Sequence, residues 1–150
     1  MSDKYVIGID PDSTAHGVAS YDNGELLSLK SMPLMEIVLK IEELKRLGFL
    51  GSVEAHIEDV NANKSYWHNT KGSRASFAKS ASDMGKCRQS QIELERVFEH
   101  YKIPVVKHKI SKKWKSAKIG KPEFERVTGW KGRSNEDTRS AAWFGYLGSR

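Results

Sequence analysis

An apolar strand that ends directly in a carboxylate constrains this chain more than any other feature of its sequence. The run Val6-Ile7-Gly8-Ile9 is followed at once by Asp10. A carboxylate at the end of a buried strand costs free energy unless a cation or a hydrogen-bonding partner pairs with its charge. The sequence therefore predicts that another part of the chain, or a bound ion, brings a partner to Asp10.

The first thirty residues predict a three-stranded antiparallel meander. Tyr5 to Ile9 is a continuous apolar run, and His16 to Tyr21 has the character of a second short strand. Asp22-Asn23-Gly24 is a strong hairpin signal that leads into a third strand, Glu25 to Lys30.

A helix and a second acidic strand follow the meander. Apolar residues recur at helical spacing between Pro33, which suits a first helical turn, and Gly48, which suits a stop. Val53 to Ile57 then alternates apolar and polar side chains and ends in two acids, Glu58 and Asp59. Two predicted strands thus end in carboxylates.

The second half predicts two more helices around a fifth strand. Asn61 to Ser73 is polar and rich in turn-forming residues, which indicates a surface loop. A long helix ends near His100 and Ile103 to Val106 predicts the fifth strand, so the connection is expected to be a parallel crossover. The last helix starts at Ser134 to Asp137 and runs to Leu147. The long helix carries an apolar stripe, expected to pack in the core or in a dimer: Met84, Cys87, Leu94, Phe98 and Tyr101.

These elements predict a single α/β domain over residues 1–150, with a five-stranded mixed sheet flanked by helices. The ends of the first and fourth strands can be neighbours, and the last helix can place its first turn over them. Asp10, Glu58 and Asp137 are therefore expected to converge. Carboxylate oxygens suit Mg²⁺ or Mn²⁺, and two such ions about 4 Å apart can activate a water and stabilise the leaving oxygen of a phosphodiester.

The charge balance favours an anionic partner. The 150 residues carry 25 Lys and Arg against 19 Asp and Glu, a formal net charge of +6, which favours nucleic acid over an acidic small molecule. Cys87 is the only cysteine, so no internal disulfide is expected. The chain shows neither a signal peptide nor an apolar run of about 20 residues, and the expected location is the cytoplasm.

Three motifs resemble those of the RuvC Holliday junction resolvases, and the chain is similar to a short, phage-type member of that family. IGIDPD with Gly17-Val18-Ala19 resembles the family's first strand and hairpin, and HIEDV at His56 to Val60 resembles its second acidic strand. TGWKGRSNEDTRSAAWFG, Thr128 to Gly145, resembles its closing motif, in which an aspartate-x-x-aspartate-alanine pattern begins the last helix.

The resemblance implies an RNase H-like fold and metal-dependent cleavage of branched DNA by a homodimer, as in a crossover junction endodeoxyribonuclease of DNA recombination and repair. It implies that Asp10 bridges two Mg²⁺ or Mn²⁺ ions, that Glu58 binds one and that Asp137 helps to bind the other. Each subunit would cut one strand and leave 5′-phosphate and 3′-hydroxyl ends. A phage origin would place the protein in the cytoplasm of a bacterial host.

One position departs from the family pattern. Three residues after Asp137, where the family has its second aspartate, this chain has Ser140, whose hydroxyl is a poor replacement for an ionised carboxylate. Glu136 or Asp59 could compensate, or Asp137 could serve as the principal ligand. The alternative is a catalytically attenuated protein of the same fold that binds branched DNA.

Two basic regions are the candidate DNA-binding surfaces. Residues 102–121 contain eight lysines, no acid and Trp114, a composition that suits a phosphate-binding face. The loop after Glu58 places aromatic side chains among cations, which can stack on unpaired bases or wedge open a junction. The candidate DNA-binding residues of both regions are Lys64, Tyr66, Trp67, Lys71, Arg74, Lys107, Lys109, Lys112, Lys113, Lys115 and Lys118.

Other interpretations stay open. Ser134-x-x-Asp137 resembles a capping box, which would hold an acid there for helix stability alone. A glycine-isoleucine-aspartate strand before a hairpin also begins sugar-kinase and actin-like ATPase folds, but the chain lacks a second glycine-rich phosphate loop. An RNase H that acts on RNA-DNA hybrids uses the same arrangement of carboxylates.

Overall fold

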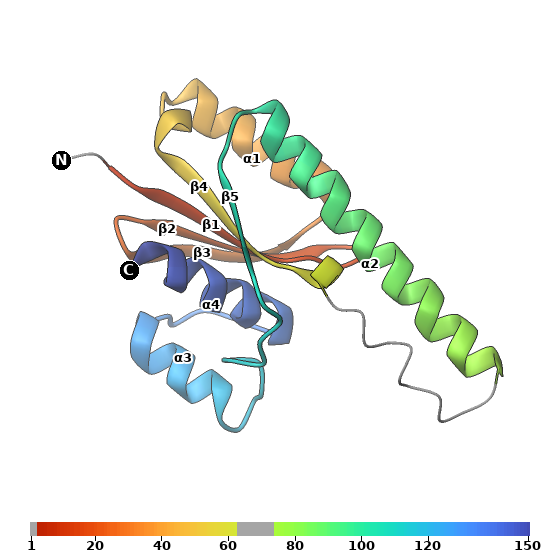
Figure 1. Cartoon of the computed structure of the whole chain (residues 1–150). Helices are drawn as coiled ribbons and strands as arrows, with labels where there is room; N and C mark the ends of the chain where they lie inside the picture. Colours follow the sequence, from red (N-terminus) through yellow and green to blue (C-terminus); the bar gives the residue numbers. More distant parts are fainter. Residues whose placement is uncertain (1–2, 63–73) are drawn as a thin grey trace.

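A five-stranded mixed sheet with helices on both faces forms the molecule (Figure 1). The computed structural model describes residues 3–62 and 74–150, with all their side chains except those of residues 74–77 and 80. The strands, in the spatial order β3-β2-β1-β4-β5, are β1 (Tyr5–Asp10), β2 (His16–Asp22), β3 (Glu25–Met32), β4 (Val53–Glu58) and β5 (Val105–His108). β1, β2 and β3 pair antiparallel, whereas β4 is parallel to both β1 and β5. The predicted fold class, meander and parallel crossover are confirmed.

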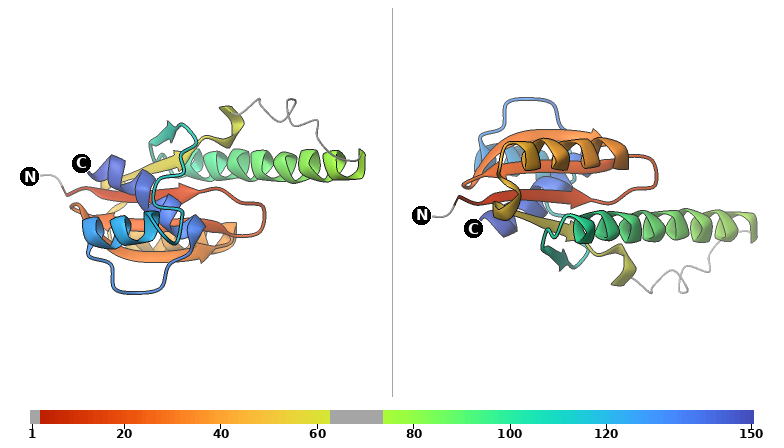
Figure 2. Two further views of the ribbon diagram at one scale, coloured as in Figure 1. Left: turned by 90° about the horizontal axis from the view of Figure 1, so that it is seen from below. Right: turned by 90° about the horizontal axis from the view of Figure 1, so that it is seen from above.

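Four helices flank the sheet: α1 (Leu34–Arg46), α2 (Arg74–His100), α3 (Gly120–Thr128) and α4 (Glu136–Ser149). Short 3₁₀ turns at Leu50–Ser52 and Val60–Ala62 flank β4. α1 and the end of α2 cover one face, while α4 covers the other with α3 outside it (Figure 1). The first half of α2 extends beyond the sheet (Figure 2). Among the described helices, none is long and apolar enough to cross a membrane.

The alternation of side chains along β1 separates two cores. Ile7 and Ile9 are fully buried against α1 and the end of α2, where Phe98 belongs to the same cluster. Val6 faces the opposite way and packs with residues of α4 and α3. Because successive side chains of a strand point to opposite faces, Asp10 lies on the same face as Val6 and Gly8, under α4.

Helix α4 lies unusually close to the sheet because glycines face it. A Cβ atom added at Gly8 would lie 2.2 Å from the carbonyl oxygen of Ala141 and 2.5 Å from the amide nitrogen of Gly145. Gly145 itself leaves room for the ring of Tyr21, whose hydroxyl donates a hydrogen bond to the Ala142 carbonyl. Backbone thus packs directly on backbone, and the small residues Ala141 and Gly145 of α4 allow this contact.

Three expectations about local structure are wrong. β5 begins two residues later than predicted, because Pro104 has no N–H to donate and Ile103 is buried without joining a strand. Helix α3 was not predicted, because it is only nine residues long and buries a single large apolar residue, Phe124. Cys87 is only partly buried, because the stripe of α2 runs out beyond the sheet.

We expect Gly8→Ala to destabilise the protein by about 2–3 kcal/mol, because the new methyl group meets main-chain atoms that have no rotamer with which to give way. The matched control is Gly51→Ala, where nothing lies within 4 Å of the added Cβ. We expect the control to change stability by less than about 0.5 kcal/mol. Urea unfolding followed by circular dichroism measures both, and equal effects would contradict the close packing of α4.

Candidate active site

The parallel pairing of β1 with β4 brings two carboxylates together. Ile9 pairs with Ile57 in the ladder, so Asp10 and Glu58 follow side by side at the strand ends. Both acids are 5% exposed and lie on the face of the sheet covered by α4. The predicted neighbourhood of the first and second acids is confirmed.

Helix α4 brings the third acid to the same edge. Asn135 caps the helix: its side chain accepts a hydrogen bond from Thr138 N, and the Thr138 hydroxyl accepts one from Asn135 N. The helix then packs on β2, where a Cβ at Gly17 would lie 2.3 Å from the carbonyl oxygen of Asp137. Gly17 is the ladder partner of Asp10, so Asp137 stands beside the first acid.

The capping box differs from the predicted one. Its members are Asn135 and Thr138, not Ser134 and Asp137. Asp137 therefore has no capping role, although an acid in the first turn still interacts favourably with the helix dipole. Helix capping therefore does not explain why residue 137 is an acid.

Burial and mutual repulsion dominate the electrostatics of the carboxylates. Burial, followed by the charge of Asp10 and a hydrogen bond to it, raises the pKa of Glu58 from 4.5 to about 8. Burial, followed by the charge of Asp10, also raises the pKa of Asp137. The raised pKa of Glu58 therefore favours its protonated form near neutral pH.

Lys115 supplies a positive charge from within the chain. Its Nζ atom lies 3.6 Å from Asp10 Oδ2, and its side chain is 29% exposed. Burial lowers the pKa of this ammonium, but the charges of Asp10, Glu58 and Asp137 outweigh that effect, so the pKa is raised. Lys115 was predicted as a DNA-binding residue on the basic surface; the structure places it against the acids.

The oxygen atoms of the site fit a hard divalent cation. Asp10 Oδ2 and Ser140 Oγ are both buried and have no hydrogen-bond partner within the described structure. A carboxylate oxygen whose ion-pair partner, Lys115, stays at 3.6 Å and a buried, unpartnered hydroxyl are oxygen ligands that suit Mg²⁺ or Mn²⁺. However, within residues 3–62 and 74–150, no group of three His, Cys, Asp or Glu side chains is already arranged to hold a metal ion.

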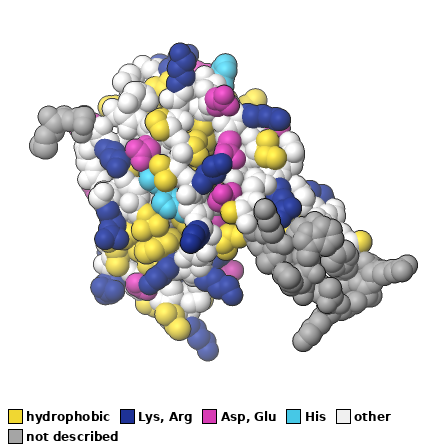
Figure 3. Space-filling view, in the orientation of Figure 1, with side chains coloured by type: hydrophobic (Ala, Val, Ile, Leu, Met, Phe, Trp, Pro, Cys, Tyr) yellow, Lys and Arg dark blue, Asp and Glu magenta, His cyan; other side chains and the backbone are white. Residues whose placement is uncertain are grey.

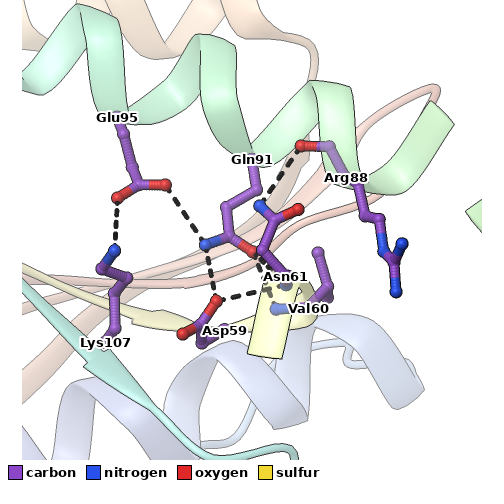
Figure 4. A network of polar contacts seen from close by, with 7 residues as sticks. All are labelled: Asp59, Val60, Asn61, Arg88, Gln91, Glu95 and Lys107. Atoms are coloured by element: carbon purple, nitrogen blue, oxygen red, sulfur yellow. Dashed lines mark hydrogen bonds and ion pairs between the residues drawn. The ribbon is translucent and has the colours of Figure 1, made fainter. Parts of the chain in front are cut away.

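Asp59, considered as a substitute for the missing aspartate, is engaged elsewhere. It accepts hydrogen bonds from Gln91 Nε2 at 2.9 Å and from the amide of Asn61 (Figure 4). Gln91 is fully buried on α2 and also accepts from the amide of Val60, while Glu95 pairs with Lys107 of β5 (Figure 4). The network fastens the end of β4 to α2, and Asp59 belongs to that fastening rather than to the acid cluster.

The lysines of β5 and of the segment after it have several different environments. Lys107 pairs with Glu95 at 3.1 Å and Lys113 with Glu123 at 3.7 Å, whereas Lys109, Lys112 and Lys118 are exposed. Lys and Arg side chains lie around the lower part of the face in Figure 3, over α3 and the segment after β5, with acids among them. Of the other candidates, Lys64, Tyr66, Trp67 and Lys71 lie outside the described residues, as does the side chain of Arg74.

Trp114 corrects the prediction of an aromatic residue on the phosphate-binding face. It is 2% exposed, and its ring lies 5.2 Å from that of Trp143 and 5.6 Å from that of Phe124. The tryptophan therefore anchors the basic segment to α3 and α4. This anchorage explains how the next residue, Lys115, reaches the acids.

Two other groups near the site were missed. Arg139 is 4% exposed on α4 and binds the segment that carries Lys115. His56 and His108 contact each other at 2.8 Å on the face that carries Glu58. Sequence offered one signal for Arg139, its place inside the closing motif between Asp137 and Ser140.

The strand order and the mixed pairing of the sheet are those of an RNase H-like fold. The structure is similar to RuvC from Thermus thermophilus in complex with a Holliday junction substrate, with a TM-score of 0.54 and 17% identity over 95% of this chain and 90% of that one. A second Thermus thermophilus RuvC structure gives a TM-score of 0.51 and 14% identity over 95% and 91%. The sequence matches no protein-family model and no curated protein.

We expect the metal-free protein to lose stability as the pH rises. The folded pKa of Glu58, about 8, exceeds its ordinary value of 4.5, so the folded state holds the proton more tightly. Its stabilising contribution is complete below the unfolded pKa and disappears as the pH approaches the folded pKa. Urea unfolding in EDTA from pH about 5 to about 9 should show this fall, and Glu58→Gln should flatten it; an equally steep fall in the variant would contradict the assignment.

Proposed function

We propose that this protein is a metal-dependent endodeoxyribonuclease that cleaves four-way junctions or other branched DNA. The observation that supports it most strongly is the meeting of Asp10, Glu58 and Asp137 with Lys115 at one edge of a RuvC-type sheet. Phosphodiester hydrolysis needs clustered oxygen ligands and a positive charge near the phosphate, and this edge contains both.

The roles of the residues follow from their positions. Asp10, Glu58 and Asp137 would hold Mg²⁺ or Mn²⁺, which supplies an activated water and stabilises the leaving oxygen. Burial and then the charge of Asp10 raise the pKa of Glu58, and a bound cation would favour the ionised, metal-binding form of this carboxyl group. Lys115 adds a fixed positive charge for the phosphate, and Asp10 orients that charge through the 3.6 Å contact.

The partner in this proposal is branched DNA bound by a homodimer, in which each subunit cuts one strand. The exposed lysines Lys109, Lys112 and Lys118 follow β5, near the site that Lys115 enters, and they suit a phosphate backbone. Lys107 and Lys113, each paired with an acid on the protein, would exchange that partner for phosphate oxygen. The first half of α2, which extends beyond the sheet, offers the second subunit a helix to pack against.

A second candidate is a branched-DNA-binding protein of the same fold with weak or no cleavage. Ser140 supports it. Residue 140 is buried, and it carries a neutral hydroxyl where the closing motif that this chain resembles has an aspartate. The site would then hold three carboxylates with at most one well-bound ion. Binding and cleavage must therefore be measured separately.

We expect Asp10→Asn to abolish nicking of a synthetic four-way junction in Mg²⁺ or Mn²⁺, because the amide cannot replace the buried carboxylate. Binding of the same junction in EDTA should remain nearly unchanged. Linear duplex and an RNA-DNA hybrid serve as control substrates. Nicking retained in the variant would refute the assignment of Asp10, and cleavage of the hybrid alone would indicate a ribonuclease H instead.

We expect Ser140→Asp to strengthen metal binding. The added carboxylate would be buried on α4, three residues after Asp137, so the variant should be less stable than the unsubstituted chain in EDTA and gain a larger increase in Tm from Mn²⁺. Differential scanning fluorimetry measures both effects, and Ser140→Ala is the matched control. Junction cleavage by the unsubstituted chain supports the nuclease, whereas cleavage only after Ser140→Asp supports the DNA-binding protein.

A further inference from the structure

The segment that carries Lys115 has a strained backbone. Trp114 has φ of 66°, a left-handed conformation that costs about 1–2 kcal/mol in a residue with a side chain. The segment also folds tightly on itself, since a Cβ at Gly120 would lie 2.4 Å from the carbonyl carbon of Trp114. Such a strained conformation persists only where several independent interactions hold the backbone in place.

Two interactions hold this strained backbone: the packing of the Trp114 ring and the hydrogen bonds of Arg139. Its Nε donates to the carbonyl of Trp114 at 2.9 Å, and its Nη2 donates to the carbonyl of Lys115 at 2.6 Å. Its Nη1 donates to the hydroxyl of Ser134 at 3.0 Å, at the entrance to α4. One planar guanidinium therefore joins α4 to both carbonyls of the strained turn.

The setting of Arg139 is costly for a cation. The residue is 4% exposed, and in the described part of the chain its hydrogen-bond partners are neutral oxygens and it forms no ion pair. A buried charge without a carboxylate is expensive unless its hydrogen bonds are well satisfied. An apolar side chain of similar volume would stabilise the folded protein at least as well as this buried cation. The guanidinium therefore indicates a role that needs its forked hydrogen-bonding geometry.

We infer that Arg139 is a positioning residue that fixes Lys115 so that its ammonium meets the scissile phosphate beside Asp10. The inference rests on the proposed nuclease function. Arg139 touches neither acid nor substrate; it acts through the carbonyl of Lys115, whose Nζ lies 3.6 Å from Asp10 Oδ2. Because α4 also carries Asp137, one helix sets both the third acid and the lysine.

Arg139→Lys tests this assignment, because it keeps the charge but cannot bind two carbonyls in a fork. We expect it to lower single-turnover junction nicking by about ten- to a hundredfold, the usual cost of a small misplacement at a reacting centre. Arg126→Lys, an exposed change on α3, should have no effect. In a Lys115→Met background, Arg139→Lys should lower nicking no further, whereas a merely structural loss would reduce nicking in both backgrounds.

A second measurement is independent of cleavage. Brief acetylation with mass spectrometry compares Lys115, which is held against the acids, with exposed Lys118. The ratio should rise severalfold in Arg139→Lys and less in Ser134→Ala, a milder variant that removes one acceptor of the guanidinium. Circular dichroism confirms that each variant is folded.

The two measurements separate the possible failures. Unchanged nicking and an unchanged acetylation ratio in Arg139→Lys would overturn the inference, as would equal losses of nicking with and without Lys115. If the unsubstituted chain nicks no substrate, the proposed function fails, and the acetylation ratio alone decides whether Arg139 positions Lys115.

Discussion

The parallel pairing of β1 with β4 is the constraint on which the site depends. It buries Asp10 and Glu58 next to each other, each only 5% exposed, and the charge of Asp10 adds to burial in raising the free energy of ionising Glu58. The question raised by an aspartate at the end of an apolar strand thus has a physical answer: the fold concentrates negative charge at one edge of the sheet, and Lys115 brings a positive charge to it.

Two sources of positive charge are available to the acids. Lys115 belongs to the chain, arrives on a strained turn and is held there by a guanidinium from α4. In the proposed function a divalent metal is the other, and the oxygens of Asp10 and Ser140, which have no hydrogen-bond partner in the described residues, would be available to it. The closing motif of the resembled family would place a further carboxylate at residue 140, where this chain has Ser140. With one carboxylate fewer, the site carries less negative charge for a metal ion to neutralise, and Lys115 neutralises a larger share of it. A serine at residue 140 is consistent with this balance of charge.

The sequence predicted those parts of the fold that depend on local patterns. Alternation and turn signals gave the meander and the acidic ends of two strands, because burial on one face imposes a period of two. Lys115 and Arg139 could not be placed in the same way. Their positions depend on a left-handed Trp114 and on helix α3, and neither leaves a periodic signal. Composition correctly marked the segment as basic, but it could not show that the tryptophan points inward.

Helix α4 rests on bare main chain at Gly8 and Gly17, and this contact restricts how the site can change over evolutionary time. Because main chain meets main chain at these two glycines, α4 has little freedom to slide or to tilt. The height of the acid at Asp137 above the strand ends is therefore constant, and only the length and charge of individual side chains remain variable. Substitutions in related chains would then change which positions carry charged side chains while the backbone stays the same. A charge absent at residue 140, for example, could be supplied from a neighbouring loop.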